Sequence, residues 1–380
     1  MQREIKVKRE TYIVTKLLSA LRVTCFTTLP ELDKFIGQKG GVFVKANGPF
    51  AIRRVSYGTL SCILFIALAL AQAPRAGAET HRFTPKTGYP TFAKRDPVLR
   101  IKPGDVVETN TLWGEWYEKA GGAWPGEVGP FFIEGATTSD TLVVKILKLR
   151  PNRDTAISTH TPNFSALAND KYTPVLNDPI PARRFIWKID RERNTGVLEL
   201  PQSKLKRIEV ELSPMLGRVA VAPPGEQSWG GLWPGEFGGN MDASDICEGA
   251  TVYLPIFHEG GLFYFGDGHA LQGDGEVCGS GLETSMDVTF EFGLIKNKRI
   301  RWPRIENNEY IMATGSVRPL MDAFRIAQIE LINWLVEDYG FDKWEALQVV
   351  SQTGTTRVAN AVDPNYTVVA RFPKKYLPRN

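Results

Sequence analysis

Residues Gly266–Glu276 read GDGHALQGDGE and bring glycines, carboxylates and a histidine together in one short stretch. Side chains at positions i and i+2 of a β-strand lie on the same face of its sheet. If Gly261–His269 forms a strand, Asp267 and His269 are therefore expected to project together. A carboxylate beside an imidazole is a common pair of ligands for a metal ion.

Three familiar glycine-rich loops do not fit this stretch. A phosphate-binding loop needs a lysine that is missing here. A dinucleotide-binding loop needs a third glycine where Leu271 and Cys278 stand, and an EF-hand loop needs an oxygen ligand where His269 stands. The stretch is therefore either a metal site or a solvated loop in which the histidine makes an ordinary hydrogen bond.

A second acidic segment, GGNMD at Gly238–Asp242, places Asn240 and Asp242 at the same i, i+2 spacing. It lies within a repeated pattern. AWPGEVGPFFIEGA (Ala123–Ala136) and LWPGEFGGNMDASDICEGA (Leu232–Ala250) share WPGE-x-G and EGA in the same order, and an alternating, strand-like segment follows each. This shared order predicts two related β halves.

The remaining sequence predicts the elements that hold these segments. The 35 glycines and 25 prolines, with many Val, Ile, Phe and Trp, favour short strands and tight turns. After Arg318, apolar residues recur at helical spacing until Gly340, Asp342 can cap a second helix over Lys343–Ser351, and a last strand is expected at Tyr366–Arg371. The helical apolar positions are Leu320, Met321, Phe324, Ala327, Leu331, Trp334 and Leu335. The predicted class is mainly β, a duplicated β-sandwich or barrel core with a C-terminal helical hairpin, α+β overall.

The N-terminal region predicts an export signal. Two arginines precede the apolar run Leu60–Ala71, and Ala76–Ala78 has the small residues of a cleavage site. The run is shorter than the roughly 20 residues that span a bilayer, and a membrane anchor or a buried helix is the alternative.

The expected parts of the chain are 1–52 as a mis-assigned extension, 53–78 as the signal, 79–215 and 216–312 as the β halves, and 313–380 as the hairpin and last strand. The mature protein is then periplasmic or secreted, without a stable membrane anchor.

The charge of the chain argues against one class of protein, and its cysteines leave one disulfide open. The net charge of +4 arises from the first 55 residues, which argues against a dedicated nucleic-acid binder. Cys247 and Cys278 would remain after signal cleavage. In an oxidising compartment they form a disulfide or stay ordinary buried cysteines.

Several motifs of the chain closely resemble the acetamidase/formamidase family. They are GGNMD, Gly249-Ala250 with TVYLPIF, GDGHALQGDGEVCG (Gly266–Gly279), Glu283, Gly129-Pro130, Glu134–Ala136, Asp140 and LGRVAVAP (Leu216–Pro223). The resemblance runs from about residue 95 to the C-terminus. It implies a mostly β fold with a duplicated core, a divalent metal, hydrolysis of small amides to carboxylate and ammonia, and a homo-oligomer.

The resemblance assigns roles that suit the residue types. Asp242, Asp267 and His269 are the expected metal ligands, and Glu276 is the expected acid/base group, because a metal can polarise an amide carbonyl while a carboxylate moves protons. Asn240 is expected to hold the amide by its carbonyl or NH₂ group. Zinc is the favoured metal, and calcium or magnesium is the alternative for an oxygen-rich site.

One motif departs from the family. Where the family has a histidine in an H-P-L-T-G-P-like segment, this chain has Trp124 at the start of WPGEVGP, which is one residue longer. Glu127 and its counterpart Glu236 either enter the site as a carboxylate pair, with Glu127 as a second catalytic candidate, or face solvent in tight turns. The leading hypothesis is an exported metal-dependent amidase. The alternative is a non-catalytic periplasmic binding or structural protein on the same scaffold.

Tryptophans gather around both repeats, and two interpretations of them are open. These residues are Trp113, Trp116, Trp124, Trp229 and Trp233. They either wall an apolar substrate pocket or close the core and an oligomer contact.

Overall fold

The computed structural model describes residues 42–45, 52–55, 78–162, 164–168 and 180–378. In the first unit of the chain, β1 (Val42–Lys45) pairs with β2 (Ile52–Val55) in antiparallel fashion. The apolar run of the expected export signal, and most of residues 1–52, lie outside the described residues. None of the described helices is long and apolar enough to cross a membrane.

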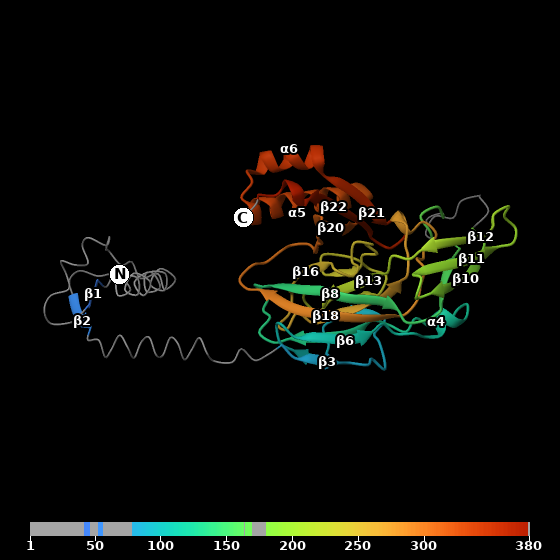
Figure 1. The fold of residues 1–380 in the computed structure, drawn as a ribbon, viewed down its shortest axis with the longest axis horizontal. Helices are drawn as coiled ribbons and strands as arrows, with labels where there is room; N and C mark the ends of the chain where they lie inside the picture. The colour runs from blue at the N-terminus through green and yellow to red at the C-terminus, as the bar shows by residue number, and fades with distance from the viewer. Residues whose placement is uncertain (1–41, 46–51, 56–77, 163, 169–179, 379–380) are drawn as a thin grey trace, which may run out of the picture. The chain divides into compact units, whose positions relative to one another are not determined.

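The second unit begins at Ala78 and contains a large sheet that carries many of its strands (Figure 1). From one edge to the other, its order is β21 (Thr355–Asn360), β22 (Tyr366–Pro373), β20 (Tyr310–Val317), β19 (Arg304–Glu306), β16 (Thr251–Pro255), β8 (Thr141–Pro151), β18 (Met286–Ile295), β6 (Val106–Asn110) and β3 (Thr80–Arg82). Neighbouring strands are antiparallel apart from β3 and β6, which are parallel.

A second sheet, called the site sheet below, carries the acidic segments. Its order is β15 (Gly238–Asn240), β13 (Met215–Val221), β17 (Phe263–His269), β7 (Val128–Ile133) and β5 (Leu99–Ile101). β13 pairs antiparallel with both β15 and β17, so the two acidic segments lie on either side of one fully buried strand.

Phenylalanines fill the space between the large sheet and the site sheet. On β17, Phe263 lies 5.2 Å from Phe292 of β18, and Phe265 lies 5.0 Å from Phe290, measured between ring centroids. All four side chains are fully buried. Burying a side chain of this size contributes about 2–3 kcal/mol to stability, so this layer is a main source of the fold's stability. The predicted β-sandwich core is confirmed.

Strands of the two sequence repeats are interleaved. β7 and β15, which follow the two WPGE segments, flank the β13–β17 pair in the site sheet. β8 and β16, which follow the two EGA segments, pair with each other in the large sheet. Residues 79–215 and 216–312 therefore share both sheets and do not form separate domains.

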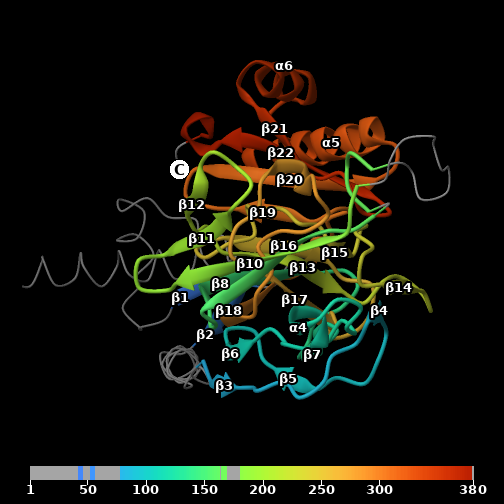
Figure 2. The same cartoon turned by 90° about the vertical axis from the view of Figure 1, so that its right-hand side faces the viewer.

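The C-terminal helical hairpin is present, and α5 (Leu320–Tyr339) packs against β20 and β22 with α6 (Lys343–Thr353) beside it (Figure 2). Gly340 ends α5 in the left-handed conformation, with φ of 69°. Asp342 caps α6 by accepting hydrogen bonds from two backbone N–H groups. The expected apolar face of α5 is wrong in its first turns, because Leu320, Met321 and Phe324 are exposed. The later predicted positions are buried as expected, and Ala323 joins them; these are Ala327, Leu331, Trp334 and Leu335.

Smaller elements surround the two main sheets. A third sheet has the order β12 (Lys206–Glu211), β11 (Thr195–Leu200), β10 (Arg183–Asp190) and β9 (Thr155–His160), and β14 (Ser228–Gly230) pairs with β4 (Thr91–Ala93). Short helical turns are α4 (Glu115–Glu118), η1 (Asp274–Glu276) and η2 (Lys374–Tyr376).

Cys247 and Cys278 are free, half-buried thiols, so the structure contains no disulfide between them.

Candidate metal centre and its surroundings

Asp267 and His269 lie together at the end of β17, as their spacing predicts. His269 Nε2 is 3.3 Å from Asp267 Oδ1, and both side chains are buried. The backbone of Asp267 has φ of 60°, which is uncommon for a residue other than glycine. Strained residues of this kind gather at functional sites, so the strain adds to the case for Asp267 as a ligand.

Asp242 follows β15 and brings its carboxylate beside that of Asp267, over Gly217 of β13. A Cβ atom at position 217 would lie 2.4 Å from Asp242 Oδ1 and 2.8 Å from Asp267 Oδ2. The missing side chain therefore leaves a gap that both carboxylates enter. Asp242 Oδ2 accepts hydrogen bonds from Asn240 Nδ2 at 2.6 Å and Asn360 Nδ2 at 2.8 Å. Its Oδ1 has no hydrogen-bond partner among the described residues.

Gln272 determines which ring nitrogen of His269 carries a hydrogen. Gln272 Nε2 donates to the carbonyl oxygens of Asp242 at 2.7 Å and Ala359 at 3.1 Å. Because those oxygens only accept, Gln272 Oε1 must face His269 Nδ1, 2.7 Å away, and accept the ring N–H. Burial opposes a second proton on the ring, but Glu283 and Asp267 outweigh it and hold the pKa of His269 well above its usual range, so the Nε2 lone pair becomes available to a cation that displaces this proton. Histidines that bind metals are oriented in this way by a partner on the other nitrogen.

Two more carboxylates complete the cluster. Glu283 Oε2 lies 3.2 Å from His269 Nε2. Ligand atoms of Asp242, Asp267 and His269 lie within 4.8 Å of one another, as do those of His269, Glu276 and Glu283. Burial, with the Asp242 charge adding to it, raises the pKa of Glu276 well above its usual range. Burial also raises the pKa of Glu283 to about 7, although His269 opposes the shift. Glu276 therefore binds a proton more readily than an exposed glutamate does.

Asn240 braces the cluster through both ends of its amide. Its Oδ1 accepts a hydrogen bond from Arg218 Nε at 2.6 Å, and its Nδ2 donates to Asp242 and to Asp363. Asn360 donates to the same two aspartates. The NH₂ group expected to hold a substrate therefore already serves two carboxylates in this structure.

Glu127 is completely buried, so the solvent-facing alternative is wrong for this residue. Its Oε1 accepts hydrogen bonds from Trp124 Nε1 at 2.9 Å and Arg218 Nη1 at 2.7 Å. Gly266 makes room for it, since a Cβ atom there would lie 2.1 Å from Glu127 Oε2. Glu236 is exposed, so the two repeats do not supply a symmetric carboxylate pair.

Arg218 connects Glu127 to the cluster. Besides its bond to Glu127, its Nε lies 3.2 Å from Asp267 Oδ2, and its guanidinium lies 4.3 Å from the centre of the Trp124 ring. Burial opposes ionisation of Asp267, but Arg218 and then His269 outweigh it and hold the pKa of that carboxyl below its usual range. Asp267 is thus kept as a carboxylate deep inside the protein.

The cluster fits a divalent cation. Three buried atoms that point into it have no hydrogen-bond partner within the described part of the chain, namely Asp242 Oδ1, His269 Nε2 and Glu283 Oε2. Buried polar groups are rarely left unsatisfied, and buried charges are usually paired or bind a metal. Two carboxylate oxygens and an imidazole nitrogen are donors that zinc accepts.

The tryptophans of the first repeat lie beside this cluster. Trp116 and Trp124 are in edge contact at 5.2 Å between ring centroids, and both pack against Tyr117. Trp113 stacks on the same tyrosine at 4.4 Å. Because Trp124 also covers Arg218, this group forms an aromatic wall next to the candidate metal centre.

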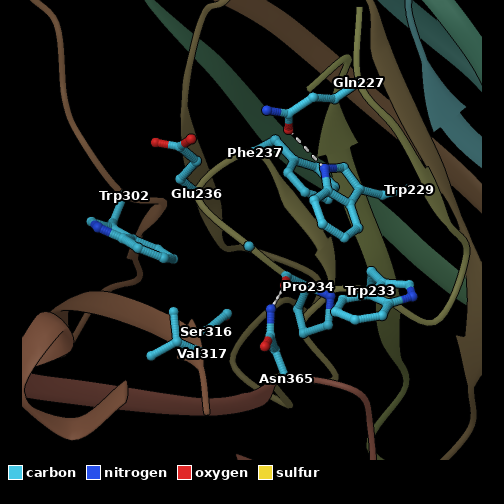
Figure 3. A pocket seen from close by; sticks show the side chains of 11 residues that line it. Gln227, Trp229, Trp233, Pro234, Glu236, Phe237, Trp302, Ser316, Val317 and Asn365 are labelled. Atoms are coloured by element: carbon cyan, nitrogen blue, oxygen red, sulfur yellow. Dashed lines mark hydrogen bonds between the residues drawn. The ribbon is translucent and has the colours of Figure 1, made fainter. Parts of the chain in front are cut away.

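The tryptophans of the second repeat line a different place, a pocket of about 340 Å³. Figure 3 shows Trp229 and Trp233 on one side of it, with Trp302 and Glu236 on the other. None of the metal-cluster residues lines this pocket. The two groups of tryptophans therefore have separate surroundings.

Sequence reasoning left out several residues of the site. Arg218 lies within LGRVAVAP and Gln272 within GDGHALQGDGE, so motif membership marked their segments but not their contacts. Glu283 is part of the family resemblance, but no role was predicted for it. Asn360 reaches the cluster from the end of β21 and Asp363 from the loop that follows, and no signal in the sequence connected these positions with GGNMD.

Several proteins of known sequence or structure are similar to this chain. Residues 231–377 match the sequence pattern of the Acetamidase/Formamidase family. The structure of an acetamidase from Yersinia enterocolitica is 37% identical with a TM-score of 0.72, and the match covers 81% of this chain and 95% of that one. An acetamidase from Bacillus halodurans is 26% identical with a TM-score of 0.65, covering 78% of this chain and 98% of that one.

Curated sequences give shorter matches. The formamidase of Methylophilus methylotrophus is 38% identical over 66 residues, which is 17% of this chain and 16% of that protein. Across the curated relatives it matches, the chain spans about half of their length or less. The match to the Yersinia structure, in contrast, runs through nearly all of that protein. The chain belongs to the acetamidase/formamidase family.

Proposed function

We propose that this protein hydrolyses a small primary amide to a carboxylate and ammonia, with a divalent cation held by Asp242, Asp267 and His269. The observation that carries the proposal is the convergence of ligand atoms that lack partners in the described structure. Without a cation between them, buried carboxylates at this separation would repel one another. The names of the matched relatives, acetamidase and formamidase, support an amide as the substrate.

Zinc is the cation we propose, because the set combines carboxylates with an imidazole nitrogen. Calcium and magnesium prefer sets made of oxygen alone. When bound, a divalent metal polarises a carbonyl group and lowers the pKa of a coordinated water to about 7. Elemental analysis of the purified protein tests the choice, and a stoichiometric content of calcium or magnesium without zinc would contradict it.

Glu276 is the proposed proton carrier. Its carboxylate takes a proton from the attacking water, and the carboxylic acid so formed delivers that proton to the departing amide nitrogen, so that ammonia leaves as a neutral molecule. Its burial beside the candidate ligand atoms supports this role, and its raised pKa favours the acid that receives and delivers the proton. We propose that Glu127 acts through Arg218, which it holds against Asp267.

Ammonia release from formamide, acetamide and larger amides tests the reaction. We expect Glu276→Gln to lower turnover by about 10²–10⁴-fold, the usual contribution of a general acid or base, with metal content unchanged. Asp274→Asn is the matched control, since this exposed neighbour pairs with Arg357 outside the cluster. Full turnover in the Glu276→Gln variant would remove Glu276 from the mechanism.

A non-catalytic binding role is the second candidate. The observation in its favour concerns Trp124, which stands at the place of the family histidine. Its ring nitrogen donates a hydrogen bond to Glu127 and its ring packs on Arg218, and an indole has no group that transfers protons. Under this hypothesis the protein binds metal and a small ligand without releasing ammonia. Metal-loaded protein that releases no ammonia from any amide of the panel would favour it over hydrolysis.

We also propose that the protein is exported and forms a homo-oligomer. The apolar run with its arginine flank supports export, and the exposed apolar side chains of α5 and α6, such as Met321 and Trp344, support a contact between copies. N-terminal sequencing of the native protein checks the first point, and light scattering checks the second. An intact Met1 or a monomeric mass would contradict the respective proposal.

A further inference from the structure

Tyr117 lies in α4, a single helical turn that precedes the WPGEVGP segment. Its ring is stacked on Trp113 at 4.4 Å and tilted against Trp124 at 5.5 Å between centroids. Trp124 covers Arg218, which in turn contacts Asp267. This series of contacts places the tyrosine at the edge of the candidate metal centre.

The hydroxyl of Tyr117 is buried and has no hydrogen-bond partner among the residues that the structure describes. A buried tyrosine normally finds a partner for this group. The charged groups near it are those of the site, with Asp267 and Glu283 first among them. Burial and these carboxylates raise its pKa well above the usual range, so the group stays a hydrogen-bond donor.

The position of Tyr117 is firmly held. Arg184 of β10 donates hydrogen bonds to the carbonyl oxygens of Trp116, at 3.0 Å, and Tyr117. The guanidinium of Arg153 lies 4.1 Å from the centre of the Trp113 ring on which the tyrosine stacks. A donor fixed in this way does not need to reorganise when a substrate arrives, and that is the property required of an oxyanion-binding group.

We propose that the Tyr117 hydroxyl donates a hydrogen bond to the carbonyl oxygen of the bound amide, and that this bond strengthens as the oxygen gains negative charge during attack by water. The inference rests on the proposed amide hydrolysis and adds a residue to it. The same repeat carries Trp124 in place of the family histidine, so α4 supplies the site with a neutral donor where the motif has lost an imidazole. The tyrosine keeps its proton throughout, and no bond other than the hydrogen bond is formed or broken at its oxygen.

Tyr117→Phe tests the inference because it removes only the hydroxyl. Loss of one preorganised oxyanion donor lowers turnover by about 10²–10³-fold in enzymes that use one. Since the hydroxyl has no hydrogen-bond partner to lose among the described residues, the temperature of unfolding should stay the same or rise. Tyr253→Phe is the matched control: its hydroxyl donates to Glu306 at 2.6 Å, away from the cluster, so this change should lower the unfolding temperature and leave turnover intact.

Trifluoroacetamide, followed by ¹⁹F NMR, reports binding and hydrolysis in one sample. We expect the wild type and Tyr253→Phe to convert it to trifluoroacetate, and Tyr117→Phe to convert it at least 100-fold more slowly and to bind it more weakly. Equal conversion by wild type and Tyr117→Phe would overturn the role of Tyr117 and leave the amidase proposal standing. If the wild type binds the amide without converting it, hydrolysis is wrong. Weaker binding by Tyr117→Phe would then still support the hydrogen bond, and equal binding would overturn it.

Discussion

Gly217 contributes no side chain to the cluster, yet it allows two ligands to meet. Its hydrogen occupies the place where a methyl group would lie 2.4 Å from Asp242 Oδ1 and 2.8 Å from Asp267 Oδ2. Both distances are far below van der Waals contact, and the surrounding strands are fully buried and cannot move apart easily. The separation of the carboxylates is therefore determined by the backbone of β13.

We expect Gly217→Ala to lower metal affinity by at least 10-fold, because the methyl group would push the two carboxylates away from the positions in which both can bind one cation. The measurement is metal content after dialysis against a graded metal buffer. Gly293→Ala is the control, since the nearest atom to a Cβ atom at this strand position is a Val143 carbon at 3.5 Å, an ordinary contact. Unchanged affinity in the Gly217→Ala variant would show that these carboxylates do not bind the metal together.

For single residues, the sequence predicted which residue types lie at the site and that two of them lie side by side. It did not predict what surrounds each side chain. The i, i+2 spacing correctly placed Asp267 beside His269. It could not show that Glu127 is buried, because its position depends on Arg218, a residue 91 positions away in the sequence. For the same reason the spacing could not show that Asn240 bonds to Arg218 and Asp363, which come from other segments.

Among the elements, the turn before β8 shows how one carboxylate connects strands. Asp140 accepts hydrogen bonds from the backbone N–H groups of Thr137 and Asn297, both at 2.9 Å, and from Lys296 Nζ. It thereby ties the start of β8 to the end of its neighbour β18. Burial opposes ionisation, but these donors outweigh it and hold the pKa of Asp140 well below its usual range.

A carboxyl whose pKa is lower in the folded state stabilises the protein above its unfolded pKa of about 3.9, and this contribution is lost as the pH falls toward the folded value. We expect Asp140→Asn to lower the free energy of unfolding near neutral pH by about 2 kcal/mol, from the charged hydrogen bonds that it weakens. The difference from wild type should shrink below about pH 4. Urea unfolding at a series of pH values measures both effects, and a difference that stays constant down to acid pH would contradict this account.

Helix ends and strand spans were predicted well because their signals are local. Gly340 and Asp342 mark the end of α5 and the start of α6 where the structure has them. The strand over Tyr366–Arg371 is β22. The short α4 was not predicted, because one turn of helix has no periodicity and is held by Arg184 from a distant strand. The apolar pattern misled only in the first turns of α5, where the small Ala323 lies against Gly315 of β20 and the larger apolar side chains face outward.

For the whole molecule, metal binding and folding are expected to be linked. The proposed ligands come from β15, β17 and the segments after them, so a bound cation would bridge parts of the chain that separate on unfolding. A ligand that binds only the folded state stabilises it by about 4 kcal/mol at a thousand times its dissociation constant. We therefore expect a chelator to lower the unfolding temperature of wild-type protein and added zinc to restore it.

The Gly217→Ala variant provides the control for this linkage. Its unfolding temperature should respond less to chelator and to zinc at the same concentrations, because its ligands no longer meet. Differential scanning fluorimetry is sufficient for the comparison. An identical response in both proteins would indicate that zinc acts somewhere other than the cluster.

The sequence repeats predict two related halves but not how the strands of the two repeats pair. The expectation of a first and a second half at 79–215 and 216–312 treats each as a continuous block. In the structure, β7 and β15 flank a shared strand pair, and β8 pairs with β16. Strand order depends on contacts between the repeats, and a pattern within each repeat contains no information about them.

The contribution of Asn360 and Asp363 has a consequence for the order in which the site folds. These residues lie at the end of β21 and just after it, and they donate to or accept from Asp242 and Asn240, which stand 118 and 123 positions earlier in the sequence. The β13–β17 pair can form without them, but Asp242 and Asn240 gain these partners only when β21 has reached its place beside β22. Completion of the site is therefore a non-local event, of the kind that proceeds slowly.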